Sequence, residues 1–172
     1  MKMTAGLLTG IKETARAFSR MMMPAAVFSL LVVTQGCGRP PLFDQNKSFE
    51  NHVWRSDDII RFDVNVTDTV HIHKYFLNVR HSTDYRYANL YVFINSTFPD
   101  GRQARDTVEC ILAEPSGKWL GKGISTVRDN QILLRRGLRF PKTGNYIFEI
   151  EQAMREEELH GIMDIGIRIE RE

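Results

Sequence analysis

The segment Met163–Glu170 has the sequence MDIGIRIE, in which every second residue is apolar. Successive side chains of a β-strand point to opposite faces of its sheet, so a period of two predicts a strand with one buried face and one solvated face. The same pattern recurs in Ile60–Val66 and in Tyr146–Ile150, far apart in the chain. Strands, not helices, are therefore the expected building blocks of this protein.

Shorter alternations and turn signals fill the rest of the chain. The further strand-like segments are Tyr75–Val79, Leu90–Ile94 and Val108–Leu112. Turns are indicated at Pro99–Gly101 and Pro141–Gly144, because proline presets one backbone angle and glycine accepts a positive one. Only Gln152–Gly161 has the composition of a short helix. The sequence therefore predicts an all-β fold, a single antiparallel β-sandwich of the jelly-roll or immunoglobulin-like type.

The amino-terminal part has a different character. An apolar run, Met21–Val33, follows cationic residues and is shorter than the roughly 20 apolar residues that span a membrane. It leads into Thr34-Gln35-Gly36-Cys37-Gly38, which resembles a bacterial lipoprotein signal. In such a signal, cleavage before the cysteine leaves a thiol that takes a diacylglyceryl group, and acylation of the new amino terminus makes the anchor stable. We therefore predict a lipoprotein signal peptide in residues 1–36 and lipidation of Cys37.

Two alternatives to a lipoprotein remain open at this point. A cut at an A-x-A-like site would release a secreted protein with Cys37 as a free thiol, and an uncleaved leader would itself be the anchor. Thr34 differs from the Leu, Val or Ile that lipoprotein signals usually place three residues before the cysteine. Translation from one of the methionines Met21–Met23 would shorten the leader.

Beyond the signal the chain is expected to form one domain. Residues 37–52 are predicted to be the lipidated cysteine and a tether stiffened by prolines, and residues 53–172 to be the β-sandwich. The whole chain has 23 basic and 21 acidic residues, a balance that excludes the one-sided basic field of a nucleic-acid-binding protein. Once Cys37 is acylated, Cys110 is the one remaining cysteine of the sequence, so no intrachain disulfide can form.

No residue pattern in the sequence predicts catalysis, a metal site or a cofactor. His71 and His73 would share one strand face, as in many zinc and copper sites, but no third ligand accompanies them, and two solvated histidines explain the pattern more simply. No serine lies in a nucleophile elbow, and Cys110 falls on an inward strand face, where a thiol is inert. Alternating glutamates such as Glu149 and Glu151 suit a solvated sheet face. We expect a protein that is not an enzyme and has no small-molecule substrate.

The aromatic residues allow two interpretations. Trp54 and Trp119, extended by Tyr85, Tyr87 and Tyr91, would form a platform for stacking on sugar rings. Large aromatic side chains in a sandwich more often fill the core or its rim, and the glycines on both sides of Trp119 favour a tightly packed turn. We therefore expect packing, and keep binding of carbohydrate or peptidoglycan as the alternative function.

Two kinds of surface site are also predicted. Thr69 and Thr107 lie in Asp-Thr-Val triplets that resemble sites of periplasmic O-glycosylation in Bacteroidetes. The segment Ala153–Met163 mixes adaptable apolar side chains with charged ones, which suits a recognition loop, although a plain crossover between strands explains the same residues. The candidates for docking a partner protein are Met154, Arg155, Leu159, Ile162 and Met163.

Several longer stretches are similar to one known family. They are Asn78–His81 with Asp84-Tyr85 and Tyr87–Leu90, Thr97–Gly101, Gly117–Gly123, Asp129–Leu134, Ile150–Arg155 and Gly161–Asp164. From about Trp54 to the carboxyl terminus, the sequence resembles the gliding motility lipoprotein GldH family of the Bacteroidetes. The lipoprotein signal at Cys37 agrees with this resemblance.

The resemblance implies a lipid-anchored protein of the cell envelope that is needed for gliding in species that glide. It also implies partners among the envelope proteins of the gliding and type IX secretion apparatus, and it supplies no catalytic or ligand residue. Surface lipoproteins of these bacteria tend to carry acidic residues just after the cysteine. Because Gly38-Arg39-Pro40-Pro41 has none, we expect a periplasm-facing domain.

Replacing Cys37 by alanine tests the anchor. Without the thiol no diacylglyceryl group can be attached, so the Cys37→Ala protein should move from the membrane pellet to the soluble fraction. Cell fractionation with immunoblotting measures this, and the Cys110→Ala protein is the matched control that should stay in the pellet. A Cys37→Ala protein that still sediments with membranes would contradict lipidation.

Overall fold

Strands make up most of residues 39–172, the part of the chain that the computed structural model describes. The predicted signal peptide and Cys37 lie outside the described residues. Within them there is no α-helix, and nothing helical is long and apolar enough to cross a membrane. In chain order the elements are β1 (Phe43–Ser48), the 3-10 turn η1 (Glu50–His52), β2 (Val53–Arg55), β3 (Ile60–Val66), β4 (His73–Ser82), β5 (Asn89–Thr97), β6 (Gln103–Ile111), β7 (Val127–Leu138), β8 (Gly144–Gln152), β9 (Glu158–His160) and β10 (Ile162–Arg171).

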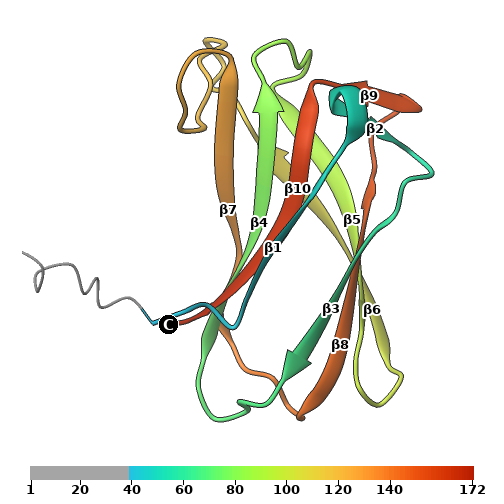
Figure 1. Cartoon of the computed structure of the whole chain (residues 1–172), viewed down its shortest axis with the longest axis vertical. Coiled ribbons are helices and arrows are strands. Elements are labelled where there is room, and N and C mark those ends of the chain that lie inside the picture. The colour runs from blue at the N-terminus through green and yellow to red at the C-terminus, as the bar shows by residue number, and fades with distance from the viewer. Residues whose placement is uncertain (1–38) are drawn as a thin grey trace, which may run out of the picture. The chain divides into compact units, whose positions relative to one another are not determined.

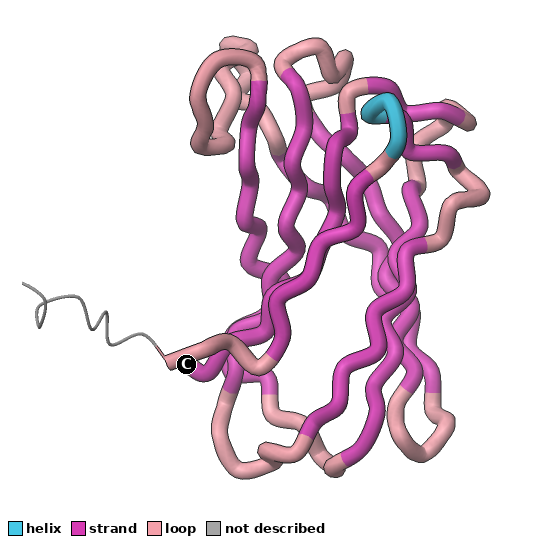
Figure 2. Tube along the Cα trace, in the orientation of Figure 1, coloured by secondary structure: helices cyan, strands magenta, loops and turns pink. Residues whose placement is uncertain are grey.

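These strands form two four-stranded sheets and one short two-stranded ribbon, and all pairs are antiparallel (Figure 1). The first sheet has the order β1-β10-β4-β7, the second has the order β3-β8-β5-β6, and β2 pairs with β9. Figure 2 shows the loops gathered at the two ends of the strands. The expected all-β class with antiparallel pairing is confirmed.

One hydrophobic core joins the inward faces of the two four-stranded sheets. β10 contributes three completely buried isoleucines at alternate positions, Ile165, Ile167 and Ile169. Across the core, the Tyr75 ring of β4 lies 5.3 Å from the Phe148 ring of β8. The hydrophobic effect therefore stabilises the contact between the two sheets, since both contribute buried apolar side chains to one core.

The alternation that marks β10 is broken at Met163. Ile162 pairs with His81 of β4, and Asp164 pairs with Arg80, the neighbour of His81 on the same strand. β10 therefore advances two residues where β4 advances one, and Met163 is the extra residue of a β-bulge. Ile162 consequently points into the core, and Met163, which a period of two places on the core face, is only half-buried. A strict period of two cannot predict a bulge, because the extra residue is defined by the partner strand.

The first strand lies in the segment that was expected to be tether. β1 pairs with β10 over all six of its residues, from Phe43 opposite Ile169 to Ser48 opposite Asp164. It is an edge strand with polar residues on both faces, so no hydrophobic alternation marks it in the sequence. The folded unit accordingly begins at Pro40, before the predicted boundary at residue 53.

The segment Gln152–Gly161, which has a helix-capable composition, is a crossover that contains β9. Leu159 of β9 lies opposite Trp54 of β2, and both side chains are completely buried. Trp54 also stacks on Phe49 with 5.3 Å between ring centroids and donates its indole N–H to the Asp58 carbonyl at 2.9 Å. Burial of Leu159 against this tryptophan outweighs the weak helix propensity of so short a segment.

Gly166 lies at the centre of the first sheet, between Asn46 of β1 and Asn78 of β4. A Cβ atom at this position would lie 1.8 Å from Asn46 Oδ1 and 2.4 Å from the carbonyl oxygen of Gln45. The second atom belongs to the backbone and cannot rotate away. A larger residue therefore fits only if β1 moves.

The Gly166→Ala variant should lower the free energy of unfolding by about 1–3 kcal/mol, the usual cost of adding atoms to a closely packed site. Urea unfolding of residues 40–172, followed by tryptophan fluorescence, measures this. Thr107→Ala, on the exposed edge strand β6, is the control and should change the free energy by less than about 0.5 kcal/mol. Identical unfolding midpoints for the two variants would show that the contact at Gly166 is not tight.

Candidate functional site

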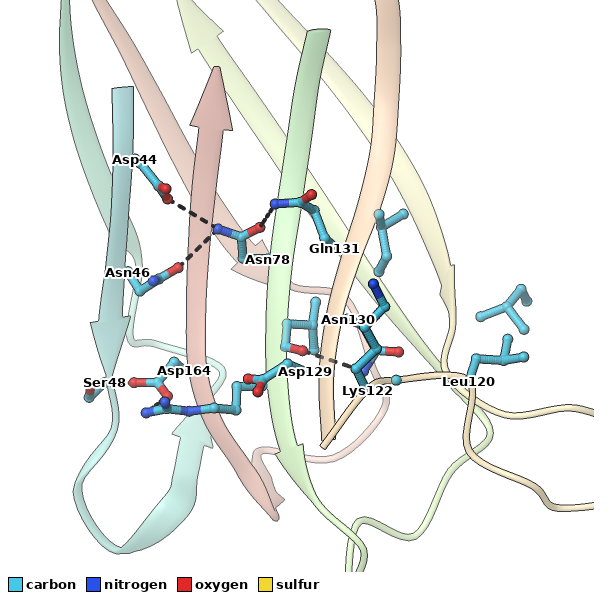
Figure 3. A pocket seen from close by; sticks show the side chains of 15 residues that line it. Asp44, Asn46, Ser48, Asn78, Leu120, Lys122, Asp129, Asn130, Gln131 and Asp164 are labelled. Carbon is cyan, nitrogen blue, oxygen red and sulfur yellow. Dashed lines mark hydrogen bonds and ion pairs between the residues drawn. The ribbon is translucent and has the colours of Figure 1, made fainter. Parts of the chain in front are cut away.

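An open groove of about 870 Å³ lies on the outer face of the first sheet, the face turned away from the core. All four strands contribute to its floor, and the loop between β6 and β7 forms one side of its rim (Figure 3). The side chains labelled in Figure 3 are Asp44, Asn46, Ser48, Asn78, Leu120, Lys122, Asp129, Asn130, Gln131 and Asp164. Because it is concave and brings together polar residues from distant segments, this groove is the candidate functional site.

A chain of side-chain amides crosses the floor of the groove. Asn78 Nδ2 donates to Asn46 Oδ1 at 3.2 Å and to Asp44 Oδ1 at 3.5 Å. Gln131 Nε2 donates in turn to Asn78 Oδ1 at 3.3 Å. β10 lies between β1 and β4, and the contact between Asn46 and Asn78 passes over Gly166, which has no side chain to block it. These bonds hold the amides of β1, β4 and β7 in one row.

A buried carboxylate lies at one end of this row. The side chain of Asp164 is only 7% exposed; its carboxylate accepts a hydrogen bond from Ser48 Oγ and forms an ion pair with Arg80. A buried charge requires such partners, because removing an unpaired ion from water costs several kcal/mol. The Arg80 side chain is 47% exposed, so the positive charge of the pair faces solvent in the groove.

The rim formed by the β6–β7 loop is partly apolar. Leu120 and Ile111 are each 51% exposed and line the groove. Backbone hydrogen bonds in both directions between Lys122 and Asp129, at 2.9 and 2.6 Å, fix the loop to the start of β7. The groove therefore combines a polar floor, which can form hydrogen bonds, with an apolar part of its rim, which offers modest apolar contact.

The two histidines that were considered as metal ligands, and interpreted as solvated, do not share a face. His73 is the first residue of β4 and is buried, with its ring 5.5 Å from the ring of Phe140. His71 lies in the preceding loop, is exposed, and its Nδ1 bonds the Asp68 carboxylate at 2.7 Å. Among the described residues, no three His, Cys, Asp or Glu side chains lie close enough to hold a metal ion.

His81 belongs to an aromatic cluster at the margin of the core. Its side chain is completely buried, and Nδ1 donates to the Ser82 carbonyl oxygen at 2.9 Å. The Trp119 ring lies 4.6 Å from the imidazole ring and the Tyr85 ring lies 5.8 Å from it. Burial lowers the pKa of His81, because a charged imidazole loses its hydration in this environment.

The aromatic residues considered as a sugar platform mostly pack. Trp54 and Tyr85 are buried, and Trp119 is half-buried against the core. Tyr87 and Tyr91 are half-buried. The expectation of packing is confirmed for the two tryptophans and Tyr85. The five rings do not form one exposed platform.

Cys110 is completely buried on β6, on the inward face that its strand position predicts. Burial raises the pKa of its thiol to about 12, so the thiol stays protonated near neutral pH. A protonated, inaccessible thiol is a packing group, not a nucleophile.

The residues proposed for partner docking do not form one free surface. Leu159 and Ile162 are completely buried, so their side chains cannot contact a partner of the folded domain. Met154 packs against the core, and its sulfur accepts a backbone N–H of β5 at 3.3 Å. Met163 is half-buried at the bulge and Arg155 is exposed. Docking through this segment stays a prediction that only its exposed residues can support.

The two threonines proposed for O-glycosylation lie in different settings. Thr107 is exposed on edge strand β6, and Thr69 is half-buried in the loop between β3 and β4. Asp68 turns this loop tightly, because one of its carboxylate oxygens accepts the N–H groups of Val70 and His71 at 3.0 and 3.1 Å. Modification of Thr69 and Thr107 stays a prediction.

The fold defines a small all-β domain, and comparison with known proteins places it in a family. The family model described as GldH lipoprotein matches residues 41–169. A Gliding motility lipoprotein GldH homolog of Christiangramia forsetii is 32% identical over 82% of this chain and 90% of its own length. The Gliding motility lipoprotein GldH of Flavobacterium johnsoniae is 31% identical over 78% of this chain and 87% of its own length. The chain belongs to the GldH lipoprotein family.

A solved structure, titled "Structure of infectious bursal disease virus Gx strain", aligns with 75% of this chain and 28% of its own chain. The identity is 11% and the TM-score is 0.27. A similarity this low carries no argument about fold or function.

The groove was not predicted from the sequence. Asn78 and Gln131 occur in stretches that resemble the GldH family, but nothing local marks them as neighbours of Asn46. They meet because β10 and β4 pair in one particular register, and a register involves partners far apart in the chain. The one sequence signal for the groove was Gly166, because a glycine among the isoleucines of β10 indicates that another group approaches this strand closely.

The buried His81 should make stability depend on pH. The unfolded chain binds a proton at this residue below about pH 6.5, whereas the folded protein resists protonation because the pKa is lowered. The stabilisation is therefore complete above that pH and is lost as the pH falls through 6.5 toward the lower pKa of the folded state.

Urea unfolding at about pH 8, 7, 6 and 5 measures the effect. The His81→Gln variant should lose less stability between about pH 7 and 5 than the unmodified domain, whatever its stability at pH 8. His160→Gln, at an exposed position of β9, should keep the original pH dependence. Parallel pH curves for the unmodified domain and His81→Gln would refute the role of His81.

Proposed function

We propose that this protein is a lipid-anchored, non-catalytic component of the bacterial cell envelope that binds another envelope protein. The observation that carries the proposal is the match to the GldH lipoprotein family over residues 41–169, together with relatives named as gliding motility lipoproteins. In a species that glides, the partner belongs to the gliding machinery and the associated type IX secretion apparatus. The domain faces the periplasm, held to the membrane through acylated Cys37.

The fold is best interpreted as a β-sandwich of the jelly-roll type. Two four-stranded antiparallel sheets share one core, and the orders β1-β10-β4-β7 and β3-β8-β5-β6 interleave the strands as two Greek keys do. Such a sandwich offers a rigid sheet face for recognition, which supports the placement of the partner site on the first sheet.

The groove supports the binding role because its side chains are already ordered. Asn46, Asn78 and Gln131 hold one another through hydrogen bonds, so a partner that bonds to them pays little for fixing their rotamers. A lipid anchor adds to this, since confinement at a membrane raises the effective concentration of the domain for partners in the same layer. Modest affinity is then sufficient.

Site-specific photocrosslinking in cells tests the proposal. A photoreactive amino acid at Leu120, on the groove rim, should repeatedly capture one or a few envelope proteins that mass spectrometry identifies. The same amino acid at Asn65, exposed on β3 of the second sheet, is the matched control and should not capture them. Equal capture from both positions, together with a deletion strain normal in motility, secretion and envelope integrity, would remove the proposal.

Binding of carbohydrate or peptidoglycan is a second candidate function, and one observation favours it. The groove floor presents amides and carboxylates in a row, and such side chains form hydrogen bonds with sugar hydroxyl groups. Purified residues 40–172 can be screened against peptidoglycan fragments and polysaccharides, with Asn78→Ala as the groove variant. Binding that Asn78→Ala abolishes without a change in unfolding midpoint would favour this function, and turnover of a small molecule would indicate an enzyme.

A further inference from the structure

Both ends of the described chain lie at one end of the two sheets, which we call the tether end. β1 starts there, β10 finishes there opposite it, and Figure 1 shows the carboxyl terminus beside the start of β1. The tether end comprises residues 39–42, the loops 67–72, 98–102 and 139–143, and residue 172. The far end comprises residues 49–59, 83–88, 112–126 and 153–161, which are loops apart from η1, β2 and β9.

The acidic side chains of the tether end are neutralised by ion pairs. Each carboxylate in its loops, and the one at the carboxyl terminus, has a basic partner; the pairs are Asp68–Arg171 at 2.6 Å, Asp100–Lys142 at 3.0 Å and Glu172–Arg136 at 3.9 Å. On the adjoining strands, Arg168 pairs with Glu170 at 2.8 Å and also with Asp44, so these two carboxylates share one guanidinium. No acidic group of these loops is therefore left to balance further positive charge.

Besides Arg39, three basic side chains in or beside the tether end are in surplus. Lys74 is the second residue of β4, beside the 67–72 loop, Arg135 lies near the end of β7, and Arg139 follows that strand. None of the three forms an ion pair within residues 39–172. The loops of the far end have the opposite balance, with more acidic than basic residues, among them Glu156-Glu157-Glu158.

Two apolar side chains project from the same end. Val70 is 74% exposed and Ile72 is 40% exposed, both in the loop between β3 and β4. The carboxylate of Asp68 holds this loop through the backbone N–H of Val70 and an ion pair with Arg171. Exposed valine and isoleucine beside surplus cations suit the interface of a membrane with anionic lipids.

The length of chain between Cys37 and Phe43 restricts which end can face a membrane. A fully extended segment of six residues reaches about 20 Å. β4, with ten residues, makes the distance between the two ends of the first sheet about 33 Å. The segment is therefore too short to reach from the membrane past the whole length of the first sheet. A domain anchored at Cys37 cannot rest its far end on the membrane with its tether end pointing away from it.

We propose that the tether end is a membrane-contacting surface. Lys74, Arg135 and Arg139 bind the anionic headgroups of phospholipids, and Val70 and Ile72 enter the interface. The orientation rests on the proposed lipid anchor at Cys37, whereas the affinity of this surface for anionic lipid does not. The far-end loops then point away from the bilayer.

The orientation is tested with the full lipoprotein in vesicles of phosphatidylethanolamine and phosphatidylglycerol. Val70→Cys at the tether end and Ile124→Cys at the far end, where the native side chain is 90% exposed, are each labelled with bimane. Cys110 is buried and an acylated Cys37 has no free thiol, so only the introduced cysteine reacts. Lipids with a nitroxide near the headgroup should quench the label at position 70 at least about threefold more strongly than at position 124.

Equal quenching at the two positions, or stronger quenching at position 124, overturns the proposed orientation. Label found on Cys37 by mass spectrometry shows instead that the lipid anchor, and with it the proposed function, has failed. In that case the affinity for lipid still tests whether the tether end binds membranes, because this affinity is measured on residues 40–172, which lack the anchor.

The affinity is measured by flotation of residues 40–172, which contain every strand and the whole core, with phosphatidylglycerol vesicles at about 50 mM salt. The variant Lys74→Glu/Arg135→Glu/Arg139→Glu should bind at least about tenfold more weakly than the unmodified domain. The control variant Arg86→Glu/Lys118→Glu/Arg155→Glu reverses three exposed charges of the far end and should bind like the unmodified domain. Absence of binding by the unmodified domain, or an equal loss of binding in both variants, overturns the proposal that the tether end contacts the membrane.

Discussion

The pairing of β10 with β1 on one side and with β4 on the other is the interaction on which the rest of the structure depends. It places the last strand of the chain at the centre of the first sheet, where Ile165, Ile167 and Ile169 form the middle of the core. The same strand supplies Gly166, over which Asn46 reaches Asn78, and the bulge beside Asp164. The core, the floor of the groove and the attachment of the first strand therefore all require β10 in its register.

The sequence predicted the parts of this fold that depend on local pattern. β3, β8 and most of β10 carry apolar residues at alternate positions that are buried in the core, so alternation alone predicted them. β1 has no buried face of its own, the bulge at Met163 exists only in relation to β4, and β9 depends on Trp54. These features need a partner strand, which a local pattern does not contain.

The candidate sites divide in the same way. Cys37 and the family were predicted from motifs, which are contiguous in the chain and therefore visible in it. The groove is an arrangement of side chains from four strands, and its members look like ordinary solvated positions until the register is known. Leu159 and Ile162 illustrate the opposite error, since two apolar residues in an apparent loop turned out to belong to the core.

The position of β1 has a mechanical consequence for a domain anchored at its amino terminus. Tension on the anchor reaches the fold at Phe43 and runs along β1, parallel to the strands of the first sheet. A load in this direction shears the whole β1–β10 ladder at once, whereas a load across the strands would open it one bond at a time. If the face of the first sheet is held while the anchor is pulled, the load therefore runs along the direction in which the sheet resists separation of its strands best.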